Sequence, residues 1–181
     1  MTDIDSILIF TDASTSSKAM LSVGAFLCLH QQQIEEYTKC SLEDLLIKLS
    51  SQLIYKIYKS KKSTWSEIKI AVDALDSIIK KSGSIRNVEI YTDCQSLCDL
   101  LNKRKEKLER NNFTTKSGSI LENAKLYKEF FLLANQFQIK IFKMKGHAPK
   151  ATRLNVHEKI FTVLDKLSRK KLRFILNNDI P

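Results

Sequence analysis

The order of strand-like and helix-like patterns along the chain restricts its fold more than any other feature. Short runs of β-branched and aromatic residues come first, and helical periodicities then alternate with further runs of that kind. Strands followed by alternating helices and strands predict an α/β domain with a mixed sheet. The predicted strands are Ile7–Phe10, Ser22–Leu29, Val88–Asp93 and Ile139–Phe142, with Ile34–Cys40 and Leu53–Tyr58 both candidates for the place beside the second strand.

The predicted helices are recognised by the residues at their ends. Ser41 begins like a helix cap, which predicts an extra helical segment at about 41–52. Thr64 and Glu67 have the spacing of a capping box, which places Glu67 in the first turn of a helix that Gly83 ends. Further helices are predicted from Gln95, at 119–137 and at 156–176. Because no repeat or linker interrupts these elements, we expect one domain over residues 1–181.

The balance of charge favours a polyanionic partner. Thirty Lys and Arg residues stand against twenty Asp and Glu residues, which gives a formal charge of +10. Such a surplus raises the local concentration of polyanions, of which nucleic acid is the commonest. The first residues are acidic, unlike a secretory signal, and no apolar run approaches the ~20 residues of a membrane span. We therefore expect a cytoplasmic protein that binds nucleic acid and no membrane.

Three acidic residues lie where the predicted elements begin or end. Asp12 ends the first strand, Glu67 lies in the first turn of a helix, and Asp93 ends a later strand. In an open α/β sheet, ligands bind beside strand ends, where a carboxylate does little for the core. Each acid alone has an equally good structural explanation, because Asp often caps a helix and Glu67 completes a capping box.

Five segments that span nearly the whole chain carry a family resemblance. They are Ile9–Ser14, Ser63–Ile68, Ile90–Ser96, Lys143–His147 and Val163–Arg169. In this order they resemble the ribonuclease H family, specifically its bacterial and eukaryotic type 1 enzymes. The resemblance implies a three-layer α/β fold, with a mixed five-stranded sheet and helices on both faces. It also implies a hydrolase, an endonuclease that cuts the RNA strand of RNA–DNA hybrids.

The same resemblance implies a metal site built from four carboxylates. In this family two divalent ions lie about 3.5–4 Å apart; they would be Mg²⁺, or Mn²⁺ instead of Mg²⁺. They activate water and stabilise the departing 3′ oxygen, which leaves 3′-hydroxyl and 5′-phosphate ends. Such hard cations need oxygen ligands and open positions for water and phosphate. Asp12 would bridge the two ions. Glu67 and Asp93 would hold the ion near the leaving group, and Asp165 would hold the ion near the attacking water.

Outside the acids, the resemblance assigns further roles. His147 follows a Lys-Gly pair in a loop and would move a proton or assist product release, with an ordinary surface histidine as the alternative. The basic stretch at about 102–118 resembles a protrusion that grips the DNA strand of the hybrid, with a solvated helix face as the alternative. Contacts to nucleic acid are expected from Ser14, Ser63, Thr64, Lys103, Arg104, Lys105, Lys107 and Lys145.

The chain departs from the family pattern in two loops, and two other functions compete. Residues 14–22 lack the usual glycines and residues 60–66 lack the usual asparagines, so contacts to ribose hydroxyls do not carry over unchanged. One alternative is a DNA nuclease of the resolvase or transposase type, which generally lacks the Lys-Gly-His loop. The other is a catalytically inactive nucleic-acid-binding relative. Four retained acids oppose that reading, because clustered carboxylates repel phosphate unless metal neutralises them. We expect a monomer with no obligatory protein partner.

Overall fold

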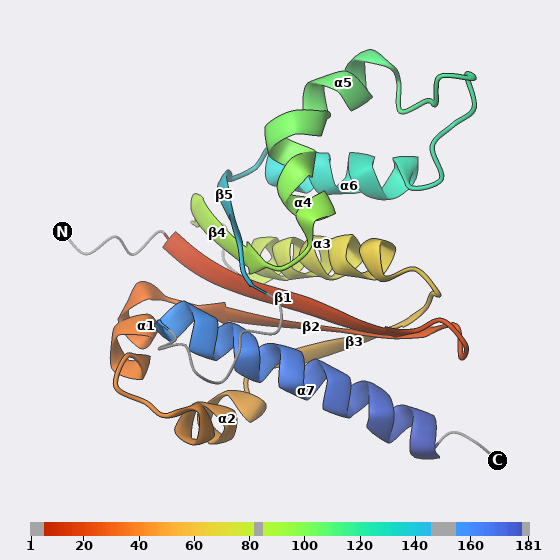
Figure 1. The fold of residues 1–181 in the computed structure, drawn as a ribbon. Helices are drawn as coiled ribbons and strands as arrows, with labels where there is room; N and C mark the ends of the chain where they lie inside the picture. Colours follow the sequence, from red (N-terminus) through yellow and green to blue (C-terminus); the bar gives the residue numbers. More distant parts are fainter. Residues whose placement is uncertain (1–5, 82–84, 146–154, 179–181) are drawn as a thin grey trace.

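Strands far apart in the sequence form one mixed sheet across the middle of the molecule (Figure 1). The computed structural model describes residues 6–81, 85–145 and 155–178. Within these ranges the sheet consists of β1 (Ser6–Ser16), β2 (Leu21–Leu29), β3 (Ile54–Lys59), β4 (Asn87–Thr92) and β5 (Gln138–Lys143). Their order is β3-β2-β1-β4-β5, with β2 antiparallel to both neighbours and β4 parallel to both neighbours. The predicted mixed five-stranded sheet is confirmed.

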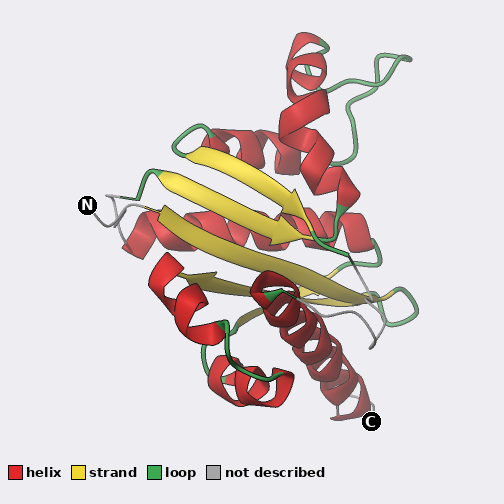
Figure 2. Cartoon of the chain, turned by 60° about the vertical axis from the view of Figure 1, so that its left-hand side comes forward, coloured by secondary structure: helices red, strands yellow, loops and turns green. Residues whose placement is uncertain are grey.

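Helices cover both faces of this sheet, as Figures 1 and 2 show. The helices on one face are α3 (Ser63–Lys81) and α6 (Ala124–Ala134), and those on the other are α7 (Val156–Asn178), α1 (Gln31–Tyr37) and α2 (Leu42–Ser50). α3 and α7 both pack on β1 and β2, while α2 packs on α7. Of the described helices, none has the length and apolarity needed to cross a bilayer.

Alternation along β1 explains why the protein has two cores. Successive side chains of a strand point to opposite faces of a sheet. Ile7 and Ile9 accordingly join the cluster that includes α3 and α6, whereas Leu8 and Phe10 join the cluster that includes α7. All four are less than a tenth exposed, so β1 is buried on both sides and anchors the fold.

The prediction of a strand at 34–40 was wrong, because this segment belongs to α1 and the chain beyond it. Ile34 and Tyr37 are buried and lie three residues apart, which places them on one helical face. Seven residues are too few for periodicity to separate a helix from a strand. β3 takes the place beside β2, with Tyr55 opposite Ala25. The extra helix after Ser41 is present, and the Ser41 hydroxyl accepts a hydrogen bond from the Asp44 backbone N–H.

The capping box at the start of α3 is also absent. The helix begins one residue before Thr64, and the Ser66 backbone N–H already donates to the Lys62 carbonyl at 3.2 Å. Glu67 is therefore in the second turn, where its side chain is buried rather than folded back on the helix start. The predicted helix end at Gly83 lies outside the described residues. The helix expected over 119–137 is shorter, because residues 119–123 form turns and an isolated bridge before α6.

The basic stretch continues a helix and stands off from the sheet. α4 (Gln95–Asp99) runs into a π-helical turn, η1 (Leu100–Arg104), and then into α5 (Lys105–Arg110). α5 and the loop that follows it extend beyond α6 at the top of Figure 1. Leu108 and Phe113 are buried and pack into the hydrophobic cluster that includes α3 and α6.

Candidate active site

The register of two neighbouring strands brings Asp12 and Asp93 to the same level of the sheet. Phe10 of β1 pairs with Tyr91 of β4 in parallel, and each acid lies two residues further along the chain. β4 ends at Thr92, whereas β1 continues to Ser16 as one arm of the hairpin with β2. Asp12 thus lies inside a long strand, and the prediction that it ends the strand was wrong. It lines the same cavity as Asp93, the residue that follows the end of β4.

Glu67 approaches the same place from α3. Its carboxylate accepts a hydrogen bond from the Ala13 backbone N–H, which fixes the helix against β1. Oxygens of Asp12, Glu67 and Asp93 all lie within 4.8 Å of one another. Glu67 is 8% exposed, and its Oε2 atom has no hydrogen-bond partner among the described residues. A buried carboxylate oxygen without a donor indicates that the cluster is built for a positively charged ligand.

Burial and mutual repulsion act on the acid–base properties of this cluster. The pKa of Asp12 is raised to about 6, because burial and, to a smaller degree, the charge of Asp93 outweigh a hydrogen bond from Ser168 and the charge of Arg169. Burial also raises the pKa of Glu67 well above its ordinary value, and the charges of Asp12 and Asp93 act in the same direction. Both shifts show that the ionised cluster lacks countercharge, which a divalent cation would supply.

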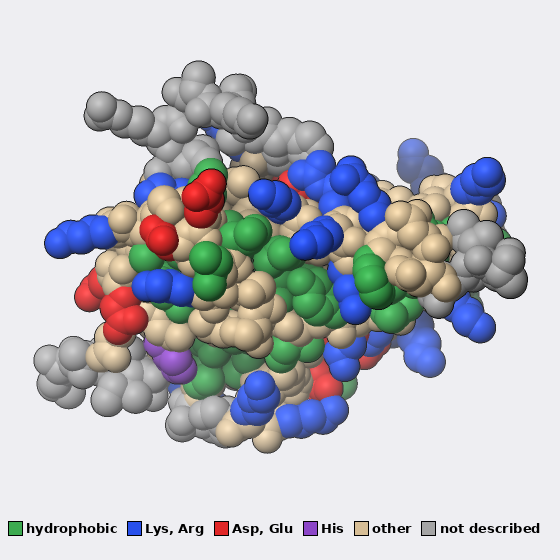
Figure 3. Space-filling view, turned by 90° about the horizontal axis from the view of Figure 1, so that it is seen from below, with side chains coloured by type: hydrophobic (Ala, Val, Ile, Leu, Met, Phe, Trp, Pro, Cys, Tyr) green, Lys and Arg blue, Asp and Glu red, His purple; other side chains and the backbone are tan. Residues whose placement is uncertain are grey.

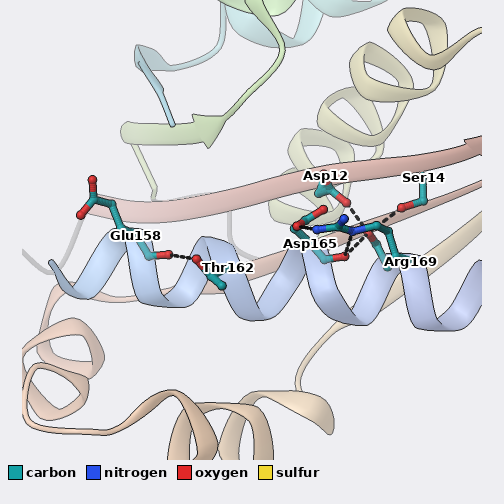
Figure 4. Close-up of polar contacts among 7 residues, drawn as sticks. Asp12, Ser14, Glu158, Thr162, Asp165 and Arg169 are labelled. Carbon is teal, nitrogen blue, oxygen red and sulfur yellow. Dashed lines mark hydrogen bonds and ion pairs between the residues drawn. The ribbon is translucent and has the colours of Figure 1, made fainter. Parts of the chain in front are cut away.

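Asp165 lies beside the cluster, on α7 (Figure 4). It forms an ion pair with Arg169, one turn further along the helix. Ser168 donates a hydrogen bond to Asp12, and the Ser14 and Ser168 hydroxyl oxygens are 3.0 Å apart. A cavity of about 360 Å³ opens among these groups. It is lined by Asp12, Ala13, Ser14, Thr15, Glu67, Asp93, Asp165, Arg169, Leu172 and Arg173. The site is therefore acidic at its base and basic at its rim.

Comparison with known proteins identifies the family. The family model named RNase H matches residues 5–158, which is most of the chain. The chain belongs to the RNase H family. Membership of the RNase H family supports a nuclease, a hydrolase that acts on RNA–DNA hybrids, and members generally use divalent metals. No curated protein matches the sequence.

Solved structures support the fold of this RNase H protein. The solution structure of the PFV RNase H domain matches with a TM-score of 0.65 at 18% identity, covering 91% of this chain and 92% of that one. LC9-RNase H1, a type 1 RNase H with the type 2 active-site motif, gives 0.61 at 13%, covering 92% and 70%. The foamy viral protease–reverse transcriptase with RNA/DNA hybrid gives 0.61 at 13% and 91% of this chain, which spans only 19% of that protein.

The other predicted contact residues are scattered relative to this RNase H site. Ser14 is half-buried within the cavity wall, whereas Ser63 and Thr64 are exposed at the start of α3. Lys145 is exposed after β5. His147 lies outside the described residues.

The four predicted basic residues of the protrusion differ in their contacts with the rest of the protein. Lys103 forms an ion pair with Asp99 at 3.2 Å. The Arg104 guanidinium lies over the Tyr127 ring at 5.5 Å. Lys105 donates to the Asn135 side chain at 2.6 Å and lies over the Phe131 ring, while Lys107 is exposed. Arg104 and Lys105 thus have a packing role that the sequence did not indicate.

Three residues of the site were given no role from the sequence, although Ser168 and Arg169 end the matching segment Val163–Arg169. Ser168 and Arg169 follow Asp165 by three and four residues, the spacing that places side chains on one helical face. Arg173 is one turn further on and lines the same cavity. Helical spacing from Asp165 was the signal that could have found all three.

Proposed function

We propose that this RNase H protein is an endoribonuclease that cleaves the RNA strand of RNA–DNA hybrids by metal-dependent hydrolysis. The products would carry 3′-hydroxyl and 5′-phosphate ends. The buried cluster of Asp12, Glu67 and Asp93 carries this proposal, because three carboxylates within 4.8 Å with an unpartnered oxygen are costly without a cation.

The donor set fits two hard divalent cations, either Mg²⁺ or Mn²⁺. All candidate ligands are carboxylate oxygens, which such ions prefer over nitrogen or sulfur. Asp12, Glu67 and Asp93 would hold one ion, and Asp12 with Asp165 would hold the second. When bound, such a pair lowers the pKa of water and neutralises charge on the departing oxygen.

The chain's own groups prepare the carboxylates for this role. Ser168 fixes one oxygen of Asp12, while the Ala13 backbone N–H fixes Glu67. Arg169 neutralises Asp165 and, with Arg173, places positive charge at the cavity rim. A phosphodiester entering the cavity would therefore meet arginines before it meets the acids, which favours binding of a polyanion at an acidic site. We also propose that His147 assists proton transfer or product release.

One assay tests the proposal directly. The full-length protein would be incubated with Mg²⁺ and end-labelled RNA–DNA hybrid, double-stranded RNA or double-stranded DNA in parallel. We expect cleavage of the hybrid's RNA strand alone, abolished by EDTA and by Asp12→Asn. Cleavage of the DNA duplex would favour a resolvase-type nuclease, and hybrid binding without any cleavage would favour an inactive relative. Asp76→Asn, on the exposed side of α3, is the matched control for loss of one acid.

A further inference from the structure

The second half of α7 carries an unusual excess of bases. Between Asp165 and Phe174 the chain has five Lys and Arg residues and one acidic residue. They are Lys166, Arg169, Lys170, Lys171 and Arg173. In the view from below, Lys and Arg side chains gather toward the right, the direction in which α7 runs in Figure 1 (Figure 3). This part of α7 was not among the predicted nucleic-acid contacts.

Helical geometry places most of these bases on one stripe beside the carboxylates. An α-helix turns by roughly 100° per residue, so positions 169, 173, 166 and 170 fall at roughly 40°, 80°, 100° and 140° from Asp165. The stripe therefore begins next to Asp165 and turns away from the sheet toward solvent. Lys171 lies on another side of the helix, where its ammonium group is 5.5 Å from the Phe174 ring.

The structure shows where this stripe meets the active-site cavity. Arg169 and Arg173 line the cavity together with the four carboxylates. Leu172, between them, is 7% exposed and holds this turn of α7 in place. Lys166, Lys170 and Arg173 are exposed, and no acidic side chain in the described parts of the chain forms an ion pair with them.

We propose that Lys166, Lys170 and Arg173 bind backbone phosphates of the strand that is cut, beside the phosphate in the carboxylate cavity. This proposal rests on the proposed function, because it takes the cavity as the place of cleavage. A phosphate in the cavity belongs to the cut strand, and Arg173 is in the wall of that same cavity. The next phosphates of that strand are thus the nearest anions to the exposed lysines. Contacts to phosphates carry no sequence information, so this surface adds affinity without sequence choice.

The first test removes the charge of the stripe and compares it with charge removed elsewhere. The test variant is Lys166→Gln/Lys170→Gln/Arg173→Gln in the full-length protein. The control is Lys39→Gln/Lys81→Gln/Lys140→Gln, which removes three exposed bases outside the cavity. We expect the test variant to raise KM roughly tenfold and to lower the slope of log affinity against log salt by roughly 2–3. The control should change either quantity much less. Equal effects of both variants would overturn the proposal.

The second test assigns the strand by neutralising phosphates of the substrate one at a time, with the stripe intact and with its charge removed. Hybrids would carry one neutral methylphosphonate at successive positions of either strand, and binding would be measured in the Asp12→Asn background, where no cleavage is expected. We expect weaker binding from substitutions next to the cut site in the RNA strand. In the stripe variant these RNA substitutions should lose most of their effect, because the contact is already absent. Coupling confined to the DNA strand would contradict the proposal.

The two proposals fail in different ways. If the parent protein cuts hybrids but the stripe variant keeps the parent's KM and salt slope, the stripe is not a substrate contact and the nuclease assignment stands. If the parent cuts nothing but the RNA-strand coupling is present, the phosphate contact stands and the nuclease assignment fails. Circular dichroism and the Tm of each variant would verify folding, which substitutions at exposed positions leave unchanged within a few degrees.

Discussion

The four carboxylates of the site occupy two different electrostatic settings. Asp12 and Glu67 are 4% and 8% exposed and lie against Asp93. Asp165 comes from another helix and has Arg169 as its ion-pair partner. The first group lacks countercharge, whereas the protein itself neutralises the fourth acid. On the proposed function, the three-acid cluster would need a cation to offset its charge, whereas Arg169 already pairs with Asp165.

Removing one acid from each setting should have the largest effect and should separate the two settings most clearly. Asp12→Asn removes a charge shared by both proposed ions, so we expect kcat/KM to fall by roughly 10³-fold or more. Asp165→Asn leaves the three-acid cluster intact, and we expect a smaller loss that higher Mg²⁺ partly restores. Initial rates on a labelled hybrid across a Mg²⁺ series would measure both. Equal losses that do not respond to Mg²⁺ would remove the distinction between the two settings.

The pH dependence of stability tests whether the cluster is short of countercharge. The pKa of Asp12 is raised from its ordinary value of 3.8 to about 6, so the folded state binds the proton more tightly than the unfolded state. Its ionisation therefore lowers stability as pH rises from about 4 to 6, and the full loss is present above that range. A rise of the Asp12 pKa from 3.8 to about 6 corresponds to a loss of about 3 kcal/mol in the free energy of unfolding.

The measurement is a comparison of urea unfolding in EDTA between the parent and Asp12→Asn. Groups that both proteins share, such as His157, whose pKa burial lowers, cancel in the difference. Below about pH 4 the two free energies of unfolding should agree. Above about pH 6 the variant should be the more stable. A variant that is less stable at pH 7.5 would show that Asp12 is satisfied without a cation.

Metal binding should supply the countercharge that the cluster lacks. A ligand that binds only the folded state at 100 times its Kd stabilises that state by about 2.7 kcal/mol. We expect Mg²⁺ to raise the Tm of the parent and to leave Glu67→Gln almost unchanged. Asp165→Asn should retain most of the rise, because the three-acid cluster is still present. Differential scanning fluorimetry with Mg²⁺ and with matched NaCl would separate binding from general screening.

The sequence predicted the parts of the fold that depend on clear local patterns. The runs at Ile7–Phe10 and Ser22–Leu29 alternate or are continuously apolar, and both are strands. The segment at 34–40 was misread because seven residues are too few for periodicity to separate a short helix from a short strand. The place beside β2 is taken by β3, and this pairing between distant segments cannot be recognised from a local sequence pattern.

The site was predictable in its acids but not in the groups that hold them. Strand ends and helix starts brought Asp12, Glu67 and Asp93 together, although Asp12 lies within β1. Ser168 is fully buried against Asp12 across 156 residues of sequence, a contact that depends on how α7 crosses β1. The packing of Arg104 over the Tyr127 ring was also not predictable, because composition does not reveal which base lies against an aromatic side chain.

The smallest expected effect concerns Ser168, the link between the two settings. Its hydroxyl lies on the same helix as Asp165 but donates to Asp12, and this hydrogen bond lowers the pKa of Asp12. In Ser168→Ala that pKa should rise further, so protons compete more strongly with Mg²⁺ for the carboxylate. We expect the Mg²⁺ affinity to fall a few-fold at pH 6, in keeping with the loss of about 1 kcal/mol from one hydrogen bond.

At pH 8 the difference should nearly disappear, because Asp12 is then ionised in both proteins. Titration calorimetry at the two pH values would measure this. Thr162→Val is the matched control, because its hydroxyl donates to the Glu158 carbonyl on the same helix, away from the acids (Figure 4). An equal loss of affinity at both pH values would mean that Ser168 positions the carboxylate rather than tuning its proton affinity. In that case Ser168 would link the two settings by fixing the position of the Asp12 carboxylate and not by lowering its pKa.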